Sequence, residues 1–108
     1  MTTALLTGWD INPKGTGDWV DWGEGGRARA KILASGDGYL FVLVEADTGY
    51  IGTPHEHTNP EFSYVLSGRV RNQGQVMEHG GAYIAGKGSH HADFEALEPS
   101  TYLNIFKL

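Results

Sequence analysis

Glycine is the feature that most constrains how this chain can fold. Sixteen of the 108 residues are glycine, and they are spread between short apolar runs along the whole chain. Glycine weakens helices and favours tight turns, so glycines spaced in this way divide a chain into short strands. No segment carries a sustained helical period. The sequence therefore predicts an all-β domain.

The runs between the glycines have the composition of strands. Residues 39–46 are almost entirely apolar, which predicts a strand covered on both faces. Basic and apolar residues alternate from residue 27 to residue 32, which predicts a strand with one face in solvent. Further short strands are expected at 61–66, 69–71, 75–78, 82–85, 91–94 and 101–108. Many short strands with turns between them are typical of a sandwich or a small barrel.

Composition excludes several classes of function. Eight basic against thirteen acidic residues give a net charge of -5, which argues against nucleic acid or an anionic membrane as the partner. The chain has no cysteine, so any metal must be held by nitrogen and oxygen atoms. The N-terminus lacks the basic start and apolar core of a signal peptide, and no apolar run is long enough to span a membrane. We therefore expect a cytoplasmic protein that binds a small molecule.

The length suits one domain with a single hydrophobic core. Residues 1–26 are rich in glycine, aspartate and tryptophan, and we expect them to form an irregular N-terminal arm. Its tryptophans, Trp9, Trp19 and Trp22, are expected to anchor the arm on the body. Residues 27–108 are expected to form the barrel.

The segment HEHTNPE, residues 55–61, suggests a metal site. His55 and His57 are two apart, so in a strand both imidazoles project from one face. Glu61 begins the next predicted strand, and a carboxylate turned towards a core is costly unless it is paired or bound to a metal. His90 and His91 are neighbours that must point to opposite faces, so only one of them can join the site. The alternative is an exposed loop glutamate beside histidines that only form hydrogen bonds.

The spacing of these residues is that of a known family. The first cupin motif, G(X)5HXH(X)3-4E(X)6G, is matched at every fixed position, by Gly49, His55, His57, Glu61 and Gly68. The second motif is matched by Gly80, Gly86, Gly88, His91 and Glu95, with Gly86 in place of the usual proline and Glu95 in place of the usual asparagine. Over roughly residues 38 to 107 the chain thus resembles small single-domain cupins of the RmlC-like superfamily.

The resemblance implies a fold and a metal centre. The fold would be a cupin-type double-stranded β-helix, a jelly roll closed into a conical barrel. One divalent metal ion would be surrounded by His55, His57, Glu61 and His91. The second motif thereby assigns His91, and not His90, as a ligand. Nitrogen and oxygen donors of this kind suit Fe(II), and also Mn, Ni, Co or Zn.

The resemblance to short cupin dioxygenases predicts an enzyme that uses Fe(II) and O2 on a diketone or a hydroxylated aryl ketone. Glu61 and His57 would then be catalytic residues as well as metal ligands. A redox-neutral isomerase, lyase or dehydratase acting on a sugar or keto acid is an alternative, and a non-catalytic module that binds a metal or small ligand is another.

The alternation of side chains along a strand predicts which face each further candidate residue occupies. Asp93 and Glu95 share a face with His91 in the predicted strand, so one of them is a candidate to orient an imidazole. The aromatic candidates to line a pocket are Tyr39, Phe41, Tyr83, Tyr102 and Phe106. Phe62, Tyr64 and Leu66 are predicted to face away from the metal. Cupins commonly pair through such a face, so the resemblance implies a homodimer.

Overall fold

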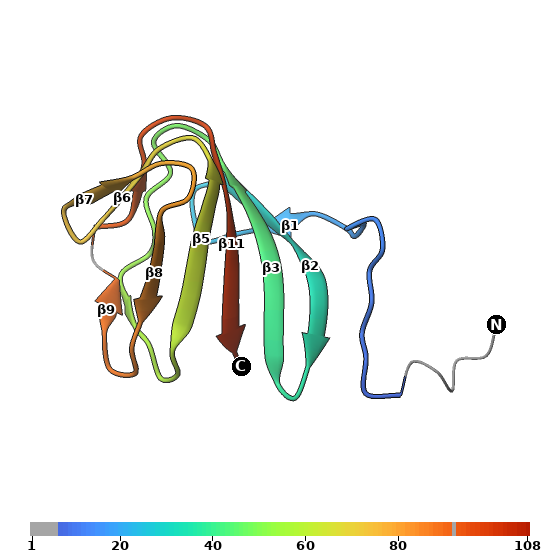
Figure 1. Ribbon diagram of the computed structural model, residues 1–108. Helices are drawn as coiled ribbons and strands as arrows, with labels where there is room; N and C mark the ends of the chain where they lie inside the picture. Colours follow the sequence, from blue (N-terminus) through green and yellow to red (C-terminus); the bar gives the residue numbers. More distant parts are fainter. Residues whose placement is uncertain (1–6, 92) are drawn as a thin grey trace.

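The computed structural model describes residues 7–91 and 93–108, except for the side chains of His55, Glu56 and His91. This part of the chain is built from strands, and none of it forms a helix that could cross a membrane (Figure 1). The strands are β1 (Val20–Asp21), β2 (Ala28–Gly36), β3 (Tyr39–Ala46), β4 (His55–Glu56), β5 (Glu61–Ser67), β6 (Val70–Asn72), β7 (Gln75–Met77), β8 (Ala82–Ala85), β9 (His90–His91), β10 (Glu95–Ala96) and β11 (Ser100–Lys107).

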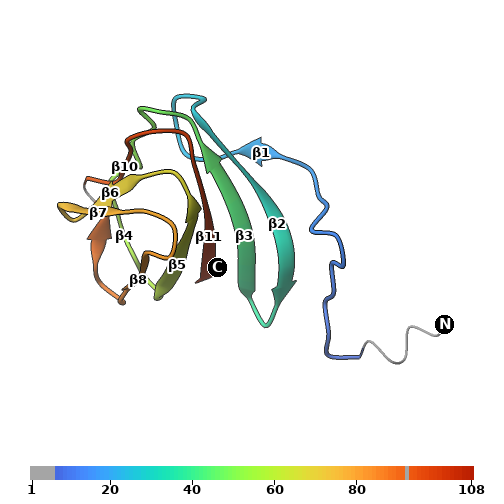
Figure 2. The ribbon, with the colours of Figure 1, turned by 45° about the horizontal axis from the view of Figure 1, so that its top comes forward.

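The strands form one large antiparallel sheet and two small ones. The order in the large sheet is β1-β2-β3-β11-β5-β8, so the last strand of the chain lies in its middle. The small sheets are β10-β6-β7 and β4-β9, and both lie towards the β5 and β8 side of the large sheet (Figures 1 and 2). The prediction of an all-β jelly-roll barrel is therefore confirmed.

Alternating burial along the strands sets which side chains face the interior. In β5, Glu61, Ser63 and Val65 are buried while Phe62 and Tyr64 are exposed, which confirms the predicted parity. The core is built largely from small and β-branched residues of the long strands. Its largest fully buried side chains are Val42, Val44, Val65 and Val70.

Strand predictions were most accurate for apolar runs between glycine turns. The predicted strand at 39–46 coincides with β3, and the one at 82–85 coincides with β8. The predicted strand at 91–94 is wrong, because Asp93 and Phe94 lie in an irregular segment between β9 and β10. Asp93 there accepts hydrogen bonds from the backbone N–H groups of Gln73 (2.8 Å) and Gly74 (2.9 Å). This side chain stabilises the β6–β7 turn. The alternation of side chains between two faces, which the strand prediction assumed, therefore does not hold in this segment.

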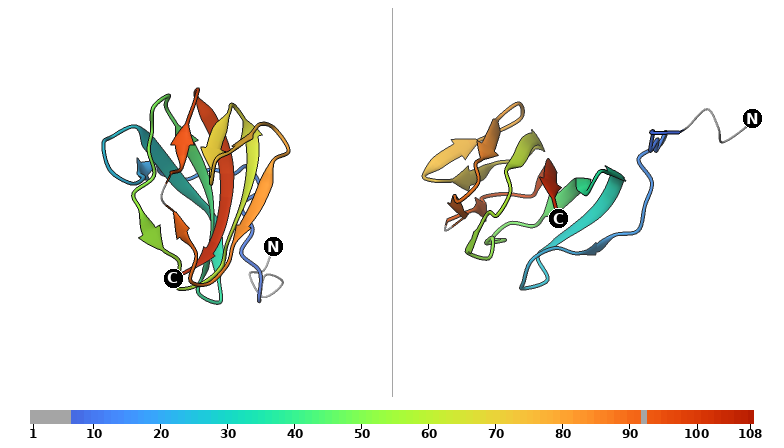
Figure 3. Two further views of the ribbon diagram at one scale, coloured as in Figure 1. Left: turned by 90° about the vertical axis from the view of Figure 1, so that its left-hand side faces the viewer. Right: turned by 90° about the horizontal axis from the view of Figure 1, so that it is seen from below.

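The described part of the N-terminal arm lies beside the edge of β2 that β1 leaves uncovered (Figure 3). The Asn12 side-chain amide donates to the backbone carbonyl of Leu33 (3.1 Å), and the Asp10 carboxylate accepts from the N–H of Ser35 (2.8 Å). Side chains of the arm thus satisfy backbone groups that a neighbouring strand would otherwise satisfy.

Only part of the predicted anchoring by tryptophan is correct. Trp22 packs against the core and lies 6.0 Å from Phe106 between ring centroids. Trp19 is partly exposed and stacks under the Lys31 ammonium group. Trp9 is 72% exposed, so it does not anchor the arm. The hydrogen bonds of Asp10 and Asn12 hold the arm there instead.

The turn after β5 explains a fixed glycine of the first motif. Gly68 has a φ of 84°, a value that residues with a side chain rarely adopt. The turn packs closely against Ser100 at the start of β11, whose Oγ accepts from the N–H of Arg69 (3.0 Å). Both the backbone conformation and the lack of space require glycine here.

Candidate functional site

The β4–β9 pair brings the predicted histidine segments together. In this antiparallel pair His55 lies opposite His91, and Glu56 lies opposite His90. The pairing continues past β4, since the N–H of His57 donates to the Ser89 carbonyl (2.8 Å) and the N–H of Gly88 donates to the His57 carbonyl (2.7 Å). The backbone therefore places three of the four predicted ligand positions in one small ladder.

His57 and Glu61 meet in the interior of the barrel. Both side chains are nearly buried, and His57 Nε2 lies 3.6 Å from Glu61 Oε1. These residues are four apart in sequence, and the turn between β4 and β5 brings them side by side in space. Among the side chains that the structure describes, no three acidic or histidine groups gather as a metal site. The side chains of His55 and His91 lie outside the described ones. The structure thus brings together two of the four predicted ligands.

Ser89 fixes the orientation and tautomer of His57. The Ser89 hydroxyl donates its only proton to the Gly86 carbonyl (2.6 Å), so its oxygen accepts the hydrogen bond from His57 Nδ1, 3.0 Å away. In the neutral imidazole, Nε2 is then the nitrogen that carries the lone pair, and it faces Glu61. A nitrogen lone pair beside a carboxylate oxygen is a donor set that fits a divalent cation.

Removing this hydroxyl gives a first testable prediction. Ser89→Ala is expected to lower metal affinity by roughly ten- to a hundredfold, because the imidazole loses the partner that holds its ring and tautomer. Isothermal titration of the chelator-treated protein with a divalent metal measures the effect. Ser89→Thr keeps the hydroxyl and should retain most of the affinity. Equal affinity of Ser89→Ala and the unaltered chain would show that Ser89 has no such role.

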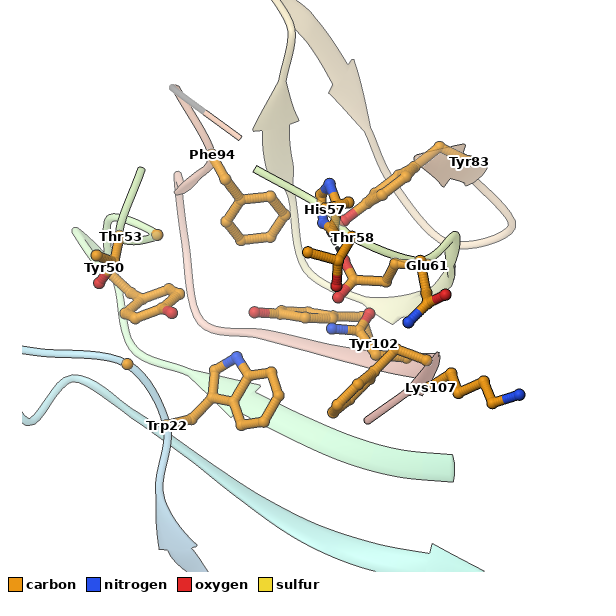
Figure 4. Close-up of a pocket in the computed structure, with 15 residues that line it drawn as sticks. Trp22, Tyr50, Thr53, His57, Thr58, Glu61, Tyr83, Phe94, Tyr102 and Lys107 are labelled. Carbon is orange, nitrogen blue, oxygen red and sulfur yellow. Dashed lines mark ion pairs between the residues drawn. The ribbon is translucent and has the colours of Figure 1, made fainter. Parts of the chain in front are cut away.

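A cavity of about 390 Å³ opens beside His57 and Glu61. Trp22 and Tyr50 lie across it from this pair, and Tyr83 extends towards His57 (Figure 4). Aromatic rings make up much of the wall, including Phe94 and Tyr102, whose centroids are 5.4 Å apart. A cavity of this size with aromatic walls and a few polar groups is typical of a small-molecule site.

The sequence identified the lining aromatic residues in part. Of the five candidates, Tyr83, Tyr102 and Phe106 line the cavity. Tyr39 and Phe41 do not line it, because the alternation of side chains along β3 places both on the opposite face of the large sheet. Trp22 and Tyr50 were missed as lining residues, since both lie in irregular segments where no periodic pattern predicts a direction.

The phenols that face the cavity stay protonated well above neutral pH. Burial, followed by the charge of Glu61, raises the pKa of Tyr83. Burial also raises the pKa of Tyr102 well above its ordinary value, and it raises the pKa of Tyr50 in the same way. These hydroxyl groups are therefore hydrogen-bond donors to anything held in the cavity.

Asn104 is a cavity residue that sequence analysis missed. It lies in the middle of β11, is only 4% exposed, and lines the cavity with Glu61 and Tyr83. Its Oδ1 atom accepts no hydrogen bond from the described part of the chain. An amide within an apolar strand was the available signal, because burying such a group without a partner is costly.

The remaining polar candidates have other roles. Glu95 forms an ion pair with Arg71 (2.6 Å), and Asp93 holds the β6–β7 turn. The His91 imidazole that one of them was predicted to orient lies outside the described side chains. The side chain of His90 is exposed, as predicted for the neighbour of a ligand. His79 is also exposed, and its ring meets that of Tyr64 edge to face.

The sequence, compared with models of protein families, matches the family described as the ChrR cupin-like domain over residues 13–107. The chain belongs to this family. The match covers almost the whole length of the ChrR-like cupin, including β1 and part of the arm. A comparison with curated proteins finds no match.

Solved structures confirm the fold of this ChrR-like cupin. KdgF from Halomonas sp. is 29% identical, with a TM-score of 0.76 over 91% of this chain and 94% of that one. The anti-sigma factor ChrR, solved in complex with SigE from Rhodobacter sphaeroides, is 24% identical, with a TM-score of 0.74 over 96% of this chain and 55% of ChrR. An acetylacetone dioxygenase from Acinetobacter johnsonii is 14% identical, with a TM-score of 0.73 over 91% and 71% of the two chains. The same fold thus serves an enzyme and a regulator.

Proposed function

We propose that this protein is a metal-dependent enzyme that acts on a small oxygen-rich molecule in the cavity. The observation that carries the proposal is the buried pair of His57 and Glu61, 3.6 Å apart at the wall of a 390 Å³ cavity. A buried histidine and carboxylate with an adjoining cavity are what a metal centre with access to substrate requires.

The proposed metal ligands are His55, His57, Glu61 and His91. The β4–β9 register supports this set, because it places His55 opposite His91 next to the buried pair. A bound divalent ion would supply Lewis-acid catalysis, or reaction with O2 if it is Fe(II). The chain itself would bind the substrate, exclude water with its aromatic walls and supply hydrogen-bond donors.

The lining of the cavity favours redox-neutral chemistry, which was the alternative in the sequence analysis. Three neutral phenols and the Asn104 amide converge on it, which suits a molecule with several hydroxyl or carbonyl groups, such as a sugar or keto acid. Proton transfer is the chemistry that such a site can perform, with the protonated hydroxyl of Tyr83, next to Glu61, as the candidate proton donor. We therefore place isomerisation, lyase or dehydratase activity first.

Fe(II)-dependent oxygenation of a diketone or an aryl ketone is the second candidate. Its support is the shared fold with an acetylacetone dioxygenase, together with aromatic walls that suit an apolar substrate. A non-catalytic role is the third, supported by the family match to a domain of an anti-sigma factor.

Three measurements on one preparation separate these roles. The metal content of untagged protein, purified without chelator, is expected to approach one ion per chain. Incubation in D2O with sugar acids and keto acids should then give deuterated substrate or product, detected by mass spectrometry, without uptake of O2. Uptake of O2 after anaerobic Fe(II) loading, with diketones, would instead favour the dioxygenase. Metal binding without either reaction would overturn an enzymatic role, and absence of metal would overturn the centre itself.

Asn104 provides a test of substrate binding that leaves the metal ligands intact. Asn104→Leu has a similar volume but no hydrogen-bonding group, so we expect KM to rise about tenfold or more while metal content is unchanged. Asn72→Leu is the matched control, since Asn72 is similarly buried but lies outside the cavity. Similar KM values for the two variants would exclude Asn104 from substrate binding.

A further inference from the structure

Trp22 lies on the side of the cavity that faces the proposed metal centre. It follows β1, at one edge of the large sheet, whereas Glu61 and Tyr83 belong to β5 and β8, at the other edge. All three side chains line the same cavity, and Trp22 lies across it from His57 and Glu61 (Figure 4). A ligand in the cavity would therefore meet the indole on one side and the polar groups on the other.

The position of Trp22 is fixed by its neighbours. Its backbone N–H donates to the Ala28 carbonyl at the start of β2 (3.0 Å), and its ring centroid lies 6.0 Å from that of Phe106. The next residue, Gly23, lies so close to Tyr50 that an added Cβ would be 2.6 Å from the phenol oxygen. The segment that carries Trp22 is thus held both by β2 and by the cavity wall.

The indole presents apolar surface to the cavity. It is only partly buried, although it packs against the core. The Phe106 ring is tilted by 53° relative to it, so the two rings do not stack face to face. An aromatic face carries partial negative charge, and it attracts C–H groups that carry partial positive charge. Trp22 can therefore bind a flat ligand through C–H groups on the ligand's face.

The opposite part of the lining offers hydrogen bonds. Burial raises the pKa of Tyr83, so its hydroxyl is a donor at neutral pH. The Asn104 amide oxygen accepts no hydrogen bond from the described part of the chain. An open-chain keto acid would leave the indole without a complementary surface, and a diketone would leave Tyr83 and Asn104 without enough partners. A sugar ring satisfies both sides, because its hydroxyl groups project from the edge of the ring while its axial C–H groups form an apolar face.

The size of the cavity limits the ligand to one ring. Small-molecule sites range over roughly 300–1,000 Å³. The volume of about 390 Å³ is near the lower end of this range, so the cavity suits a monosaccharide and not a chain of several sugars.

We propose that Trp22 is the surface on which a monosaccharide in its ring form stacks, with the sugar hydroxyls directed towards Tyr83, Asn104 and the metal centre. This inference rests on the proposed function, because it names the substrate class of the same cavity. It selects a cyclic sugar over an open-chain sugar or keto acid. Stacking would hold the hydroxyl-bearing edge of the ring at the groups that transfer the proton. Trp22 thus determines specificity without taking part in the reaction.

The fluorescence of Trp22 tests this stacking without altering the residue. The chain has three tryptophans, and replacing Trp9 and Trp19, which are exposed and outside the cavity, with phenylalanine leaves Trp22 as the single emitter. The probes are the methyl pyranosides of glucose, galactose and mannose and of their uronic acids, which cannot open, and the matching alditols, which have no ring. At least one pyranoside should change the emission at a concentration about tenfold or more below that of its alditol. No response to any pyranoside, or equal responses to pyranoside and alditol, would overturn the proposal.

Variants at position 22 give a second readout. Trp22→Leu keeps an apolar side chain but removes the aromatic face, so the affinity for the pyranoside, measured by isothermal titration, should fall about tenfold while that for the alditol changes little. Trp22→Tyr should retain most of the affinity. Trp19→Leu is the matched control, since Trp19 lies outside the cavity. Equal losses for both probes in Trp22→Leu would indicate a merely structural role and would contradict the proposal.

These titrations do not require turnover, so their failure is distinct from a failure of the proposed function. A pyranoside that stacks on Trp22 in a protein without metal-dependent activity would refute the enzymatic role and leave the stacking intact. Deuterium incorporation into a sugar acid, with no response from Trp22, would refute the stacking and leave the enzymatic role intact.

Discussion

His91→Ala is expected to abolish most metal binding, whereas His90→Ala should leave it nearly unchanged. The two residues are neighbours in β9, and we expect adjacent residues of a strand to direct their side chains to opposite faces. His91 pairs with His55, next to the buried His57 and Glu61, while the side chain of His90 is exposed. Loss of one of four ligands should weaken binding at least about a hundredfold.

Elemental analysis of the two variants, followed by titration with a divalent metal, measures this difference. His90→Ala is the control, since it removes an imidazole from the same strand and preserves the histidine count of the first variant. Equal losses would contradict the assignment of His91 as a ligand. Greater loss in His90→Ala would mean that the two side chains have the opposite arrangement.

Gly68→Ala is expected to destabilise the fold by at least about 3–5 kcal/mol, enough to unfold many domains of this size. A Cβ at this position would collide with the Pro99 carbonyl and the Ser100 hydroxyl, and would lie 2.6 Å from Ser100 Cα. Two of these three atoms belong to the backbone, so a change of side-chain rotamer cannot relieve the clash. Strain from the φ of 84° adds to the cost.

Gly74→Ala separates backbone strain from this clash. Gly74 has a similar φ of 74°, but a Cβ there would meet nothing within 4 Å. The expected loss is therefore only roughly 1–2 kcal/mol. Urea denaturation followed by tryptophan fluorescence gives the free energy of unfolding of both variants. Comparable losses in the two would show that close packing against Ser100 is not why residue 68 is glycine.

The sequence predicted the fold best where local pattern and tertiary environment agree. The strand at β3 and the alternation of β5 were interpreted correctly, but β3 is not covered on both faces as predicted, because its buried residues alternate with partly exposed ones. The prediction failed after His91, where the Asp93 side chain bonds to a turn that is distant in sequence. A contact of this kind leaves no local pattern.

The candidate site, like the fold, could be predicted from the sequence only in part. The spacing of His57 and Glu61 correctly indicated that they would meet inside the barrel. The cavity walls were less predictable, because Trp22 and Tyr50 come from irregular segments. Asn104 could have been recognised only as a polar residue in an apolar strand, and its direction depends on the register of β11 with two other strands.

The N-terminal arm also affects how readily the protein would aggregate. β2 is nine residues long, and β1 pairs with only two of them. Beyond β1, Asp10 and Asn12 bind the N–H of Ser35 and the carbonyl of Leu33, which an incoming strand from another molecule would otherwise use. An uncovered strand edge of this length promotes aggregation by edge-to-edge pairing. The arm therefore covers part of an edge that would otherwise be open to such pairing, and a chain shortened to its barrel is expected to aggregate more readily.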